Sequence, residues 1–118
     1  MTIKIQFLLE TKEIKDFVPD KIRLTRSLNQ ETGTILLSFS KVFSLDLLIN
    51  KNKPILGLYL TGKNFSFFTK EIRCIWRNGQ PILIQAIFLI DKKEELNMVF
   101  KVFKDYAKKN GLINSKID

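Results

Sequence analysis

The sequence predicts an α+β fold, an antiparallel β-sheet of about four to six strands with a C-terminal α-helix packed on one face. Turn residues divide most of the chain into short runs in which apolar residues alternate or β-forming residues dominate, a pattern typical of strands. The last third of the chain changes to the period of an α-helix. With 118 residues, of which 45% are hydrophobic, the chain is expected to form a single domain over residues 1–118.

Six runs are predicted to form strands. They are Thr2–Leu9, Lys21–Ser27, Thr34–Val42, Pro54–Leu60, Phe65–Trp76 and Pro81–Ile90. The gaps between them contain Asn29 and Gly33, then Thr61–Asn64, then Arg77–Gln80, which include residues that tolerate a positive φ. The segment Phe43–Lys53 fits either a short helical turn or an irregular sheet edge, and its sequence does not decide between them.

The Asn-Gly pair at residues 78–79 predicts a hairpin. A two-residue loop would set Ile72 opposite Gln85 and mix the two faces of the sheet. We therefore expect a three-residue loop, Arg77–Gly79, with Gly79 left-handed in a β-bulge. The resulting pairs would be Cys74 with Ile82, Ile72 with Ile84, and Phe68 with Phe88.

The C-terminal helix is predicted from one apolar stripe. Its members are Leu96, Val99, Phe100, Phe103, Tyr106 and Ala107. Asp91, followed three residues later by Glu94, resembles a capping box at the start of the helix. Gly111 marks its end, and Leu112 is placed for the hydrophobic contact that accompanies a glycine C-cap.

The last two predicted strands are apolar on both faces, so one helix leaves a second patch. Its members are Phe67, Ile75, Leu83, Ile87 and Leu89. Either the N-terminal segment or the Phe43–Lys53 segment folds over this patch, or a partner protein does. Trp76, beside the hairpin turn, fits either the core or an interface.

Composition argues against an enzyme. The chain has no His, the commonest general base and a usual member of nucleophilic dyads. One cysteine, Cys74, and scattered carboxylates provide no metal-site spacing, and the five glycines form no phosphate-binding loop. We therefore expect no catalytic residues, no metal ligands and no cofactor.

The net charge of +8 suits nucleic acid, an anionic lipid surface or an acidic protein surface. A small basic nucleic-acid-binding domain is the alternative reading, with Tyr59, Phe65 or Phe67 as stacking surfaces, but no RNA-recognition signature occurs. The sequence contains no run long and apolar enough for a membrane-spanning helix and begins with an alternating run in place of a targeting peptide. Abundant Lys, Asn, Ile and Phe, whose codons are AT-rich, suggest a plastid genome and a charge that partly reflects codon bias.

The stretch Val18–Ser27 concentrates basic and hydroxyl side chains in a segment predicted to be extended. Alternation gives it a polar face with Arg23, Thr25 and Ser27 and an apolar face with Ile22 and Leu24. Arg26 falls on the apolar side unless the strand has already ended. The stretch is either a half-buried strand with a solvated basic face or a recognition strand.

Three motifs together resemble the Psb28 family of photosystem II. They are Val18–Ser27 followed by Gly33-Thr34, then Gly57–Leu60, then Trp76–Pro81. The resemblance extends from Ile5-Gln6-Phe7 to Tyr106–Leu112 and so covers nearly the whole chain. It implies a non-catalytic accessory factor, without a cofactor, that binds assembly or repair intermediates of photosystem II and assists biogenesis of the core complex.

The resemblance also implies partners and a location. The partners would be the core antenna chlorophyll protein and the reaction-centre subunits, with no nucleic acid and no small-molecule substrate. The location would be peripheral to the thylakoid membrane, on the stromal side in a plastid or the cytoplasmic side in a cyanobacterium. The predicted partner-binding residues are Arg23, Thr25, Arg26, Ser27, Trp76, Arg77 and Asn78. We expect an extended tail of a membrane subunit to add as a strand to an open sheet edge.

Overall fold

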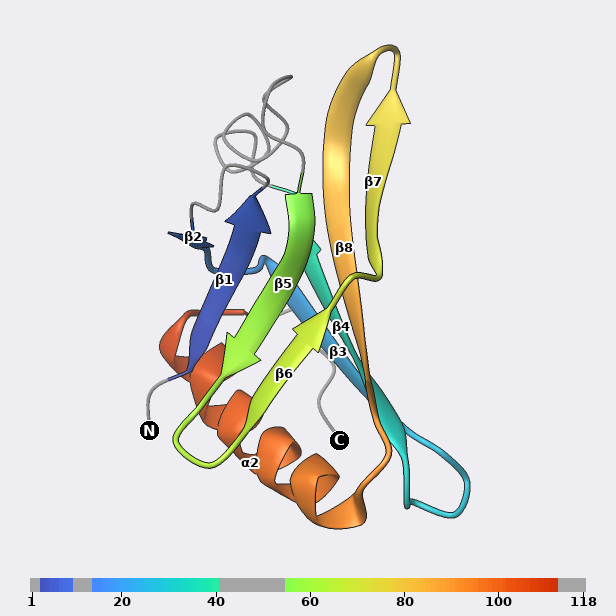
Figure 1. Ribbon diagram of the computed structural model, residues 1–118, viewed down its shortest axis with the longest axis vertical. Helices are drawn as coiled ribbons and strands as arrows, with labels where there is room; N and C mark the ends of the chain where they lie inside the picture. The colour runs from blue at the N-terminus through green and yellow to red at the C-terminus, as the bar shows by residue number, and fades with distance from the viewer. Residues whose placement is uncertain (1–2, 10–13, 41–54, 113–118) are drawn as a thin grey trace.

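The computed structural model describes residues 3–9, 14–40 and 55–112, which form eight strands and one helix (Figure 1). The strands are β1 (Lys4–Leu9), β2 (Ile14–Asp16), β3 (Lys21–Arg26), β4 (Gly33–Phe39), β5 (Ile55–Thr61), β6 (Ser66–Thr69), β7 (Ile72–Arg77) and β8 (Gln80–Ile90). The helix is α2 (Lys93–Lys109). The α+β class and the C-terminal helix are confirmed. The short strand β2 has no predicted counterpart, and Phe43–Lys53 lies outside the described residues.

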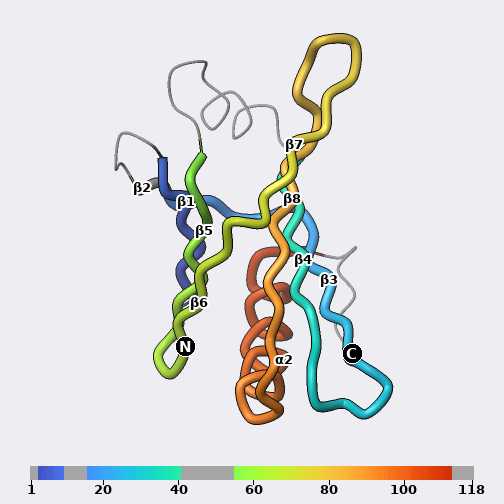
Figure 2. Tube along the Cα trace, turned by 45° about the vertical axis from the view of Figure 1, so that its right-hand side comes forward, coloured from blue at the N-terminus to red at the C-terminus, as the bar shows by residue number. Residues whose placement is uncertain are grey.

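The strands form two antiparallel sheets, where the sequence predicted one. Their orders are β2-β1-β5-β6 and β3-β4-β8-β7. Figure 2 shows α2 between the two sheets, below the point where the chain passes from β6 to β7. The helix thus covers one face of the β3-β4-β8-β7 sheet, while the other face of that sheet points away from it.

The predicted strand Phe65–Trp76 is in fact two strands, one in each sheet. Its alternation is interrupted at Lys70, whose carbonyl accepts a hydrogen bond from the Ile72 N–H at 2.9 Å, as in a tight turn. The Thr69 hydroxyl donates to the Ile87 carbonyl (2.7 Å) and accepts from the Glu71 N–H (3.0 Å). A buried threonine therefore ties the crossover to β8. No Gly or Pro marks this turn, so it has no local sequence signal.

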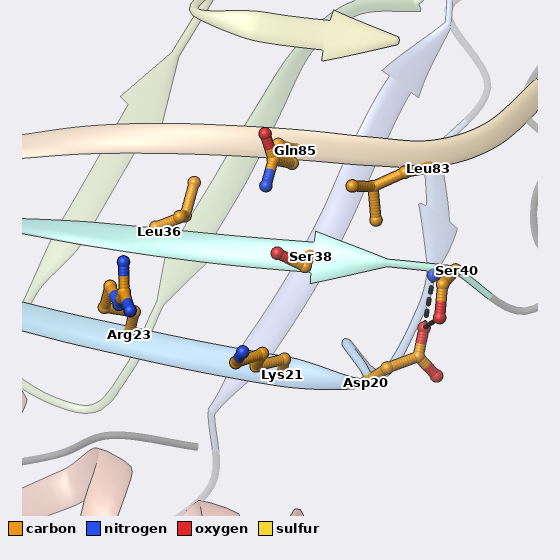
Figure 3. A pocket seen from close by; sticks show the side chains of 8 residues that line it. All are labelled: Asp20, Lys21, Arg23, Leu36, Ser38, Ser40, Leu83 and Gln85. Carbon is orange, nitrogen blue, oxygen red and sulfur yellow. Dashed lines mark hydrogen bonds between the residues drawn. The ribbon is translucent and has the colours of Figure 1, made fainter. Parts of the chain in front are cut away.

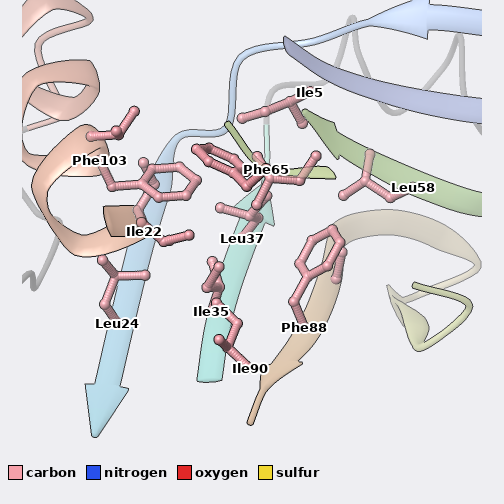
Figure 4. Close-up of a cluster of buried hydrophobic side chains, with 14 of the residues drawn as sticks. Ile5, Ile22, Leu24, Ile35, Leu37, Leu58, Phe65, Phe88, Ile90 and Phe103 are labelled. Atoms are coloured by element: carbon pink, nitrogen blue, oxygen red, sulfur yellow. The ribbon is translucent and has the colours of Figure 1, made fainter. Parts of the chain in front are cut away.

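The core lies between the two sheets and the helix (Figure 4). Its largest fully buried side chains are Phe7, Phe39 and Phe103. The Phe7 ring meets Phe39 edge-on at a centroid distance of 4.9 Å, so the first strand packs on the second sheet. The predicted helical stripe is confirmed, with Tyr106 partly buried and Val102 as an additional core residue.

The β7–β8 hairpin differs from the predicted register. Gly79 has the predicted positive φ (75°), but φ is also positive at Asn78 (52°). The Arg77–Gln80 pair closes a two-residue loop. A register shift follows, with Trp76 opposite Pro81 and Ile75 opposite Leu83, so Ile82 is the extra residue. The bulge therefore lies in the strand, not in the turn, and it restores the alternation of faces.

The predicted pairs of this hairpin are consequently wrong. Ile72 lies opposite Ala86 and Cys74 opposite Ile84, each two residues from the expected partner but on the expected face. Phe68 pairs with Tyr59 in the other sheet and does not meet Phe88.

The two ends of α2 differ in how well the sequence predicted them. Lys92, not Asp91, is the N-cap residue, and no side chain caps the helix there, so the predicted capping box is absent. At the C-terminus the Leu112 N–H donates to the Ala107 carbonyl (2.9 Å) and Gly111 has a φ of 66°. This is the Schellman geometry that the glycine predicted.

Two predicted turn glycines have other roles. Gly33 is the first residue of β4 and is buried against α2, and the positive φ in the preceding loop belongs to Gln30 (59°). Gly62 likewise lacks a positive φ, and its backbone lies against the Phe65 ring. These glycines are required by close packing and not by turn geometry.

Candidate protein-interaction surface

The face of the β3-β4-β8-β7 sheet that points away from α2 is the candidate site, and we call it the outer face. Strict alternation places its side chains opposite the core residues of the same strands. Its members are Lys21, Arg23, Thr25, Thr34, Leu36, Ser38, Arg73, Ile75, Leu83, Gln85, Ile87 and Leu89. Four of the five apolar residues predicted to form a second patch lie here. The exception is Phe67, which belongs to the other sheet and stacks on Phe65 at 5.6 Å.

The two central strands, β4 and β8, contribute four apolar side chains to the outer face together with three polar ones, and cations lie on its two edge strands. Leu36 and Ile87 are direct cross-strand neighbours, and Leu89 is 73% exposed. Arg23 on β3 and Arg73 on β7 are exposed on either side. Within the described chain, neither guanidinium makes a hydrogen bond, so both are available to a partner.

A shallow hollow of about 280 Å³ lies across this face (Figure 3). Asp20 closes one end, where its carboxylate accepts hydrogen bonds from the Ser40 N–H and hydroxyl groups. Leu36 and Leu83 supply apolar walls, and the remaining lining is polar or basic: Lys21, Arg23, Ser38, Ser40 and Gln85. Such a lining can hold an extended peptide, with cations and amides for its carboxylates and carbonyls.

The predicted site residues of β3 divide between the two faces. Arg23 and Thr25 lie on the outer face, where the Thr25 hydroxyl hydrogen-bonds the hydroxyl of Thr34. Arg26 lies on the helix side, as alternation predicted. Its guanidinium covers the Phe100 ring at 4.0 Å and donates to Asn97 Oδ1 at 3.0 Å. Arg26 therefore joins β3 to α2.

Ser27 lies in the loop after β3 and is engaged within it. Its hydroxyl donates to Asn29 Oδ1 (2.5 Å) and accepts from the Thr32 N–H (3.2 Å). The hydroxyl thus shapes the β3–β4 loop.

The remaining predicted residues, Trp76, Arg77 and Asn78, lie at the far end of the β7–β8 hairpin, which projects at the top of Figure 1. All three are exposed, and the Trp76 side chain retains 53% of its surface. The structure does not bring them next to Arg23 and Thr25. They form a separate group at one end of the same sheet.

Sequence reasoning missed six residues of the outer face: Lys21, Thr34, Leu36, Ser38, Arg73 and Gln85. Their position depends on β4 lying between β3 and β8, a pairing of segments far apart in the chain. Strand β1 does not cover this face, because it pairs with β2 and β5 in the other sheet.

The structure offers little support for other site chemistries. Among the described residues, no three Cys, Asp or Glu side chains gather where a metal ion could be held, and the sequence has no His. Burial raises the pKa of Cys74, which opposes thiolate chemistry. Phe65, a proposed base-stacking residue, is only 7% exposed and so cannot serve that role. No described helix is long and apolar enough to span a membrane.

Comparison with known proteins gives a consistent result. The family model for Psb28 protein matches residues 5–113. The chain is 31% identical to the photosystem II reaction center Psb28 protein of Phaeodactylum tricornutum, with 98% of each chain covered. It is 30% identical to that of Guillardia theta (95% of this chain, 94% of the relative) and 28% identical to that of Nostoc punctiforme (98% and 97%). The chain therefore belongs to the Psb28 family.

Proposed function

We propose that this protein is an accessory factor of photosystem II that binds assembly or repair intermediates and assists biogenesis of the core complex. As a member of the Psb28 family it is not an enzyme. The observation that carries the proposal is the outer face, a basic and partly apolar sheet surface on a chain whose relatives are named photosystem II reaction center proteins. An exposed apolar patch of this kind is typical of a protein-binding site.

The proposed partners are the core antenna chlorophyll protein and the reaction-centre subunits. Binding takes place at the thylakoid surface, on the stromal side in a plastid or the cytoplasmic side in a cyanobacterium. Relatives from algae with plastids and from cyanobacteria support this location. No cofactor and no nucleic acid takes part.

The proposed mode of binding is strand addition at the edge formed by β3. Among the described strands, β3 and β7 form the two edges of their sheet, and Arg23 and Thr25 of β3 belong to the outer face. A strand added there would place alternate side chains beside Arg23 and Thr25. Its backbone would supply affinity, and the Arg23 guanidinium would select a segment that carries a carboxylate.

The other predicted contact residues have two different roles in this proposal. Trp76, Arg77 and Asn78 form a second contact at the hairpin tip, separate from the contact that Arg23 and Thr25 make with the protein segment. Arg26 and Ser27 are held by partners of their own, so they support the binding strand: Arg26 fixes it to α2, and Ser27 shapes the loop at its end.

Affinity recovery from detergent-solubilised thylakoids tests the proposal. The tagged protein is expected to recover photosystem II core subunits, and Arg23→Glu is expected to reduce that recovery about ten-fold, because it places a like charge against the partner's carboxylate. Lys104→Glu is the matched control, since Lys104 is exposed on α2, away from the outer face. Arg26 is unsuitable for this test because its replacement also loosens the helix.

Two results would contradict the proposal. In one, core subunits are absent from the recovered material. In the other, Arg23→Glu and Lys104→Glu recover as much as the unaltered protein. Salt-sensitive retention on RNA without any photosystem subunit would favour a nucleic-acid-binding domain instead.

A further inference from the structure

The β7–β8 hairpin carries an unusual surface for an accessory domain. From Ile72 to Ile90 the chain contains two arginines, Arg73 and Arg77, and no Asp or Glu. It also contains the only tryptophan of the protein, Trp76, at 53% exposure. We call residues 73–83, the part of the hairpin around its turn, the finger.

The finger projects from the molecule and carries apolar side chains directly behind its exposed polar turn, Arg77–Gln80. In both ribbon and tube views it extends beyond the rest of the described chain (Figures 1 and 2). Trp76 lies opposite Pro81, while Ile75 and Leu83 pair on the outer face, and all of these except Trp76 are half-buried, as is Ile82. A projecting apolar surface bordered by cations suits contact with a lipid bilayer better than binding of a small ligand in a pocket.

The backbone of the finger is suited to a medium poor in water. The pairing of β7 with β8 continues to Arg77 and Gln80, directly beside the turn. Most N–H and C=O groups between the two strands are therefore already paired, which lowers the cost of burying the tip.

We propose that the finger inserts its tip into the headgroup layer of an anionic lipid bilayer. Trp76 and the polar turn Arg77–Gln80 both lie within this interfacial layer, where an indole ring with one polar edge is most stable. Arg73 and Arg77 bind the anionic headgroups. The absence of carboxylates in the hairpin favours lipid over an ordinary protein surface, which displays both signs of charge. The inference rests on the proposed function, because a factor that binds a membrane complex works beside the bilayer.

Trp76 reports directly on this insertion because it is the sole tryptophan. The full-length protein is titrated with vesicles of phosphatidylcholine containing about one third phosphatidylglycerol, and with vesicles of phosphatidylcholine alone. The Trp76 emission is expected to shift to the blue only with the anionic vesicles, and brominated acyl chains are expected to quench it.

Charge removal distinguishes the finger from the general basic charge. Arg73→Gln with Arg77→Gln is expected to lower the partition coefficient about 30-fold, since each cation near an anionic surface contributes about five-fold. Lys104→Gln with Lys108→Gln removes the same charge from the exposed side of α2 and is expected to change partitioning less than three-fold. Far-UV circular dichroism checks that both double variants remain folded.

Three outcomes would overturn the inference. One is an unshifted Trp76 emission with anionic vesicles. Another is an equal loss of binding in the two double variants, which would indicate diffuse attraction. The third is a Trp76 shift that requires photosystem II core particles in detergent, which would indicate a protein site for the finger. The vesicles contain no protein, so failure here leaves the recovery of core subunits as a separate result.

Discussion

Replacing Gly33 by alanine should destabilise the protein, although one methyl group is added to a residue of ordinary strand conformation. A Cβ atom at this position would lie 2.5 Å from the Thr25 carbonyl oxygen and 2.6 Å from Leu96 Cδ1. The first of these contacts is with the neighbouring strand's backbone, which cannot move without disturbing the β3–β4 pairing. Relief must therefore come from separation of the sheet and the helix.

The magnitude follows from two opposing terms. Overpacking of a core costs about 1–3 kcal/mol, and the upper end applies here because one of the contacts is with backbone. Replacement of glycine by alanine restricts the unfolded chain and returns about 0.4–1 kcal/mol. The free energy of unfolding of Gly33→Ala should therefore fall by about 2 kcal/mol, which corresponds to a Tm lower by roughly 10 °C.

Urea denaturation followed by far-UV circular dichroism measures this change. Leu96→Ala removes one of the two contacts, so the double variant Gly33→Ala/Leu96→Ala should lose about 1 kcal/mol less than the sum of the single variants. The reasoning is refuted if Gly33→Ala unfolds within 0.5 kcal/mol of the original protein, or if the two substitutions are additive.

Three further predictions concern other parts of the chain. Gly79→Ala should cost about 1 kcal/mol in chemical denaturation from its positive φ alone, since nothing lies within 4 Å of the added carbon; an unchanged midpoint would contradict this. Arg26→Met should cost about 1–2 kcal/mol, because it removes the cation over Phe100 and the bond to Asn97; a smaller loss in Phe100→Leu/Arg26→Met than the sum of the single variants would confirm the contact. Burial raises the pKa of Tyr106 to about 12 in the folded protein. The neutral phenol therefore contributes to the free energy of unfolding below pH 10, and this contribution is lost as the pH rises from 10 to 12. Over that pH range the denaturation midpoint of Tyr106→Phe should fall less steeply than that of the original protein. Parallel plots of midpoint against pH for the two proteins would refute the role of Tyr106.

Local sequence patterns determined much of this structure. The apolar stripe of α2 and its glycine C-cap depend on residues within a few positions of one another, so periodicity alone located them. The same holds for the alternation along β3, which placed Arg23 and Arg26 on opposite faces. The motifs beginning at Val18 indicated the Psb28 family, which the comparisons confirmed.

The errors arose where the outcome depends on distant segments. A single bulge at Ile82 set the hairpin register, and such a bulge is stabilised by packing on both faces rather than by the turn residues. The division of one apolar run into β6 and β7 depends on the Thr69 hydroxyl reaching Ile87 in another strand. Neither feature has a local sequence signal.

The sequence by itself determined which residues share a face and that the chain is basic and lacks His, because these follow from short-range periodicity and composition. Its motifs indicated the Psb28 family. Only the tertiary structure decided which face of the sheet α2 covers. The pairing of β4 with β8 joins Arg23 to the apolar residues of the outer face, and α2 packs against the other side, so none of the other described elements covers the outer face. Strand order arises from contacts between distant segments, so no window of the sequence contains it.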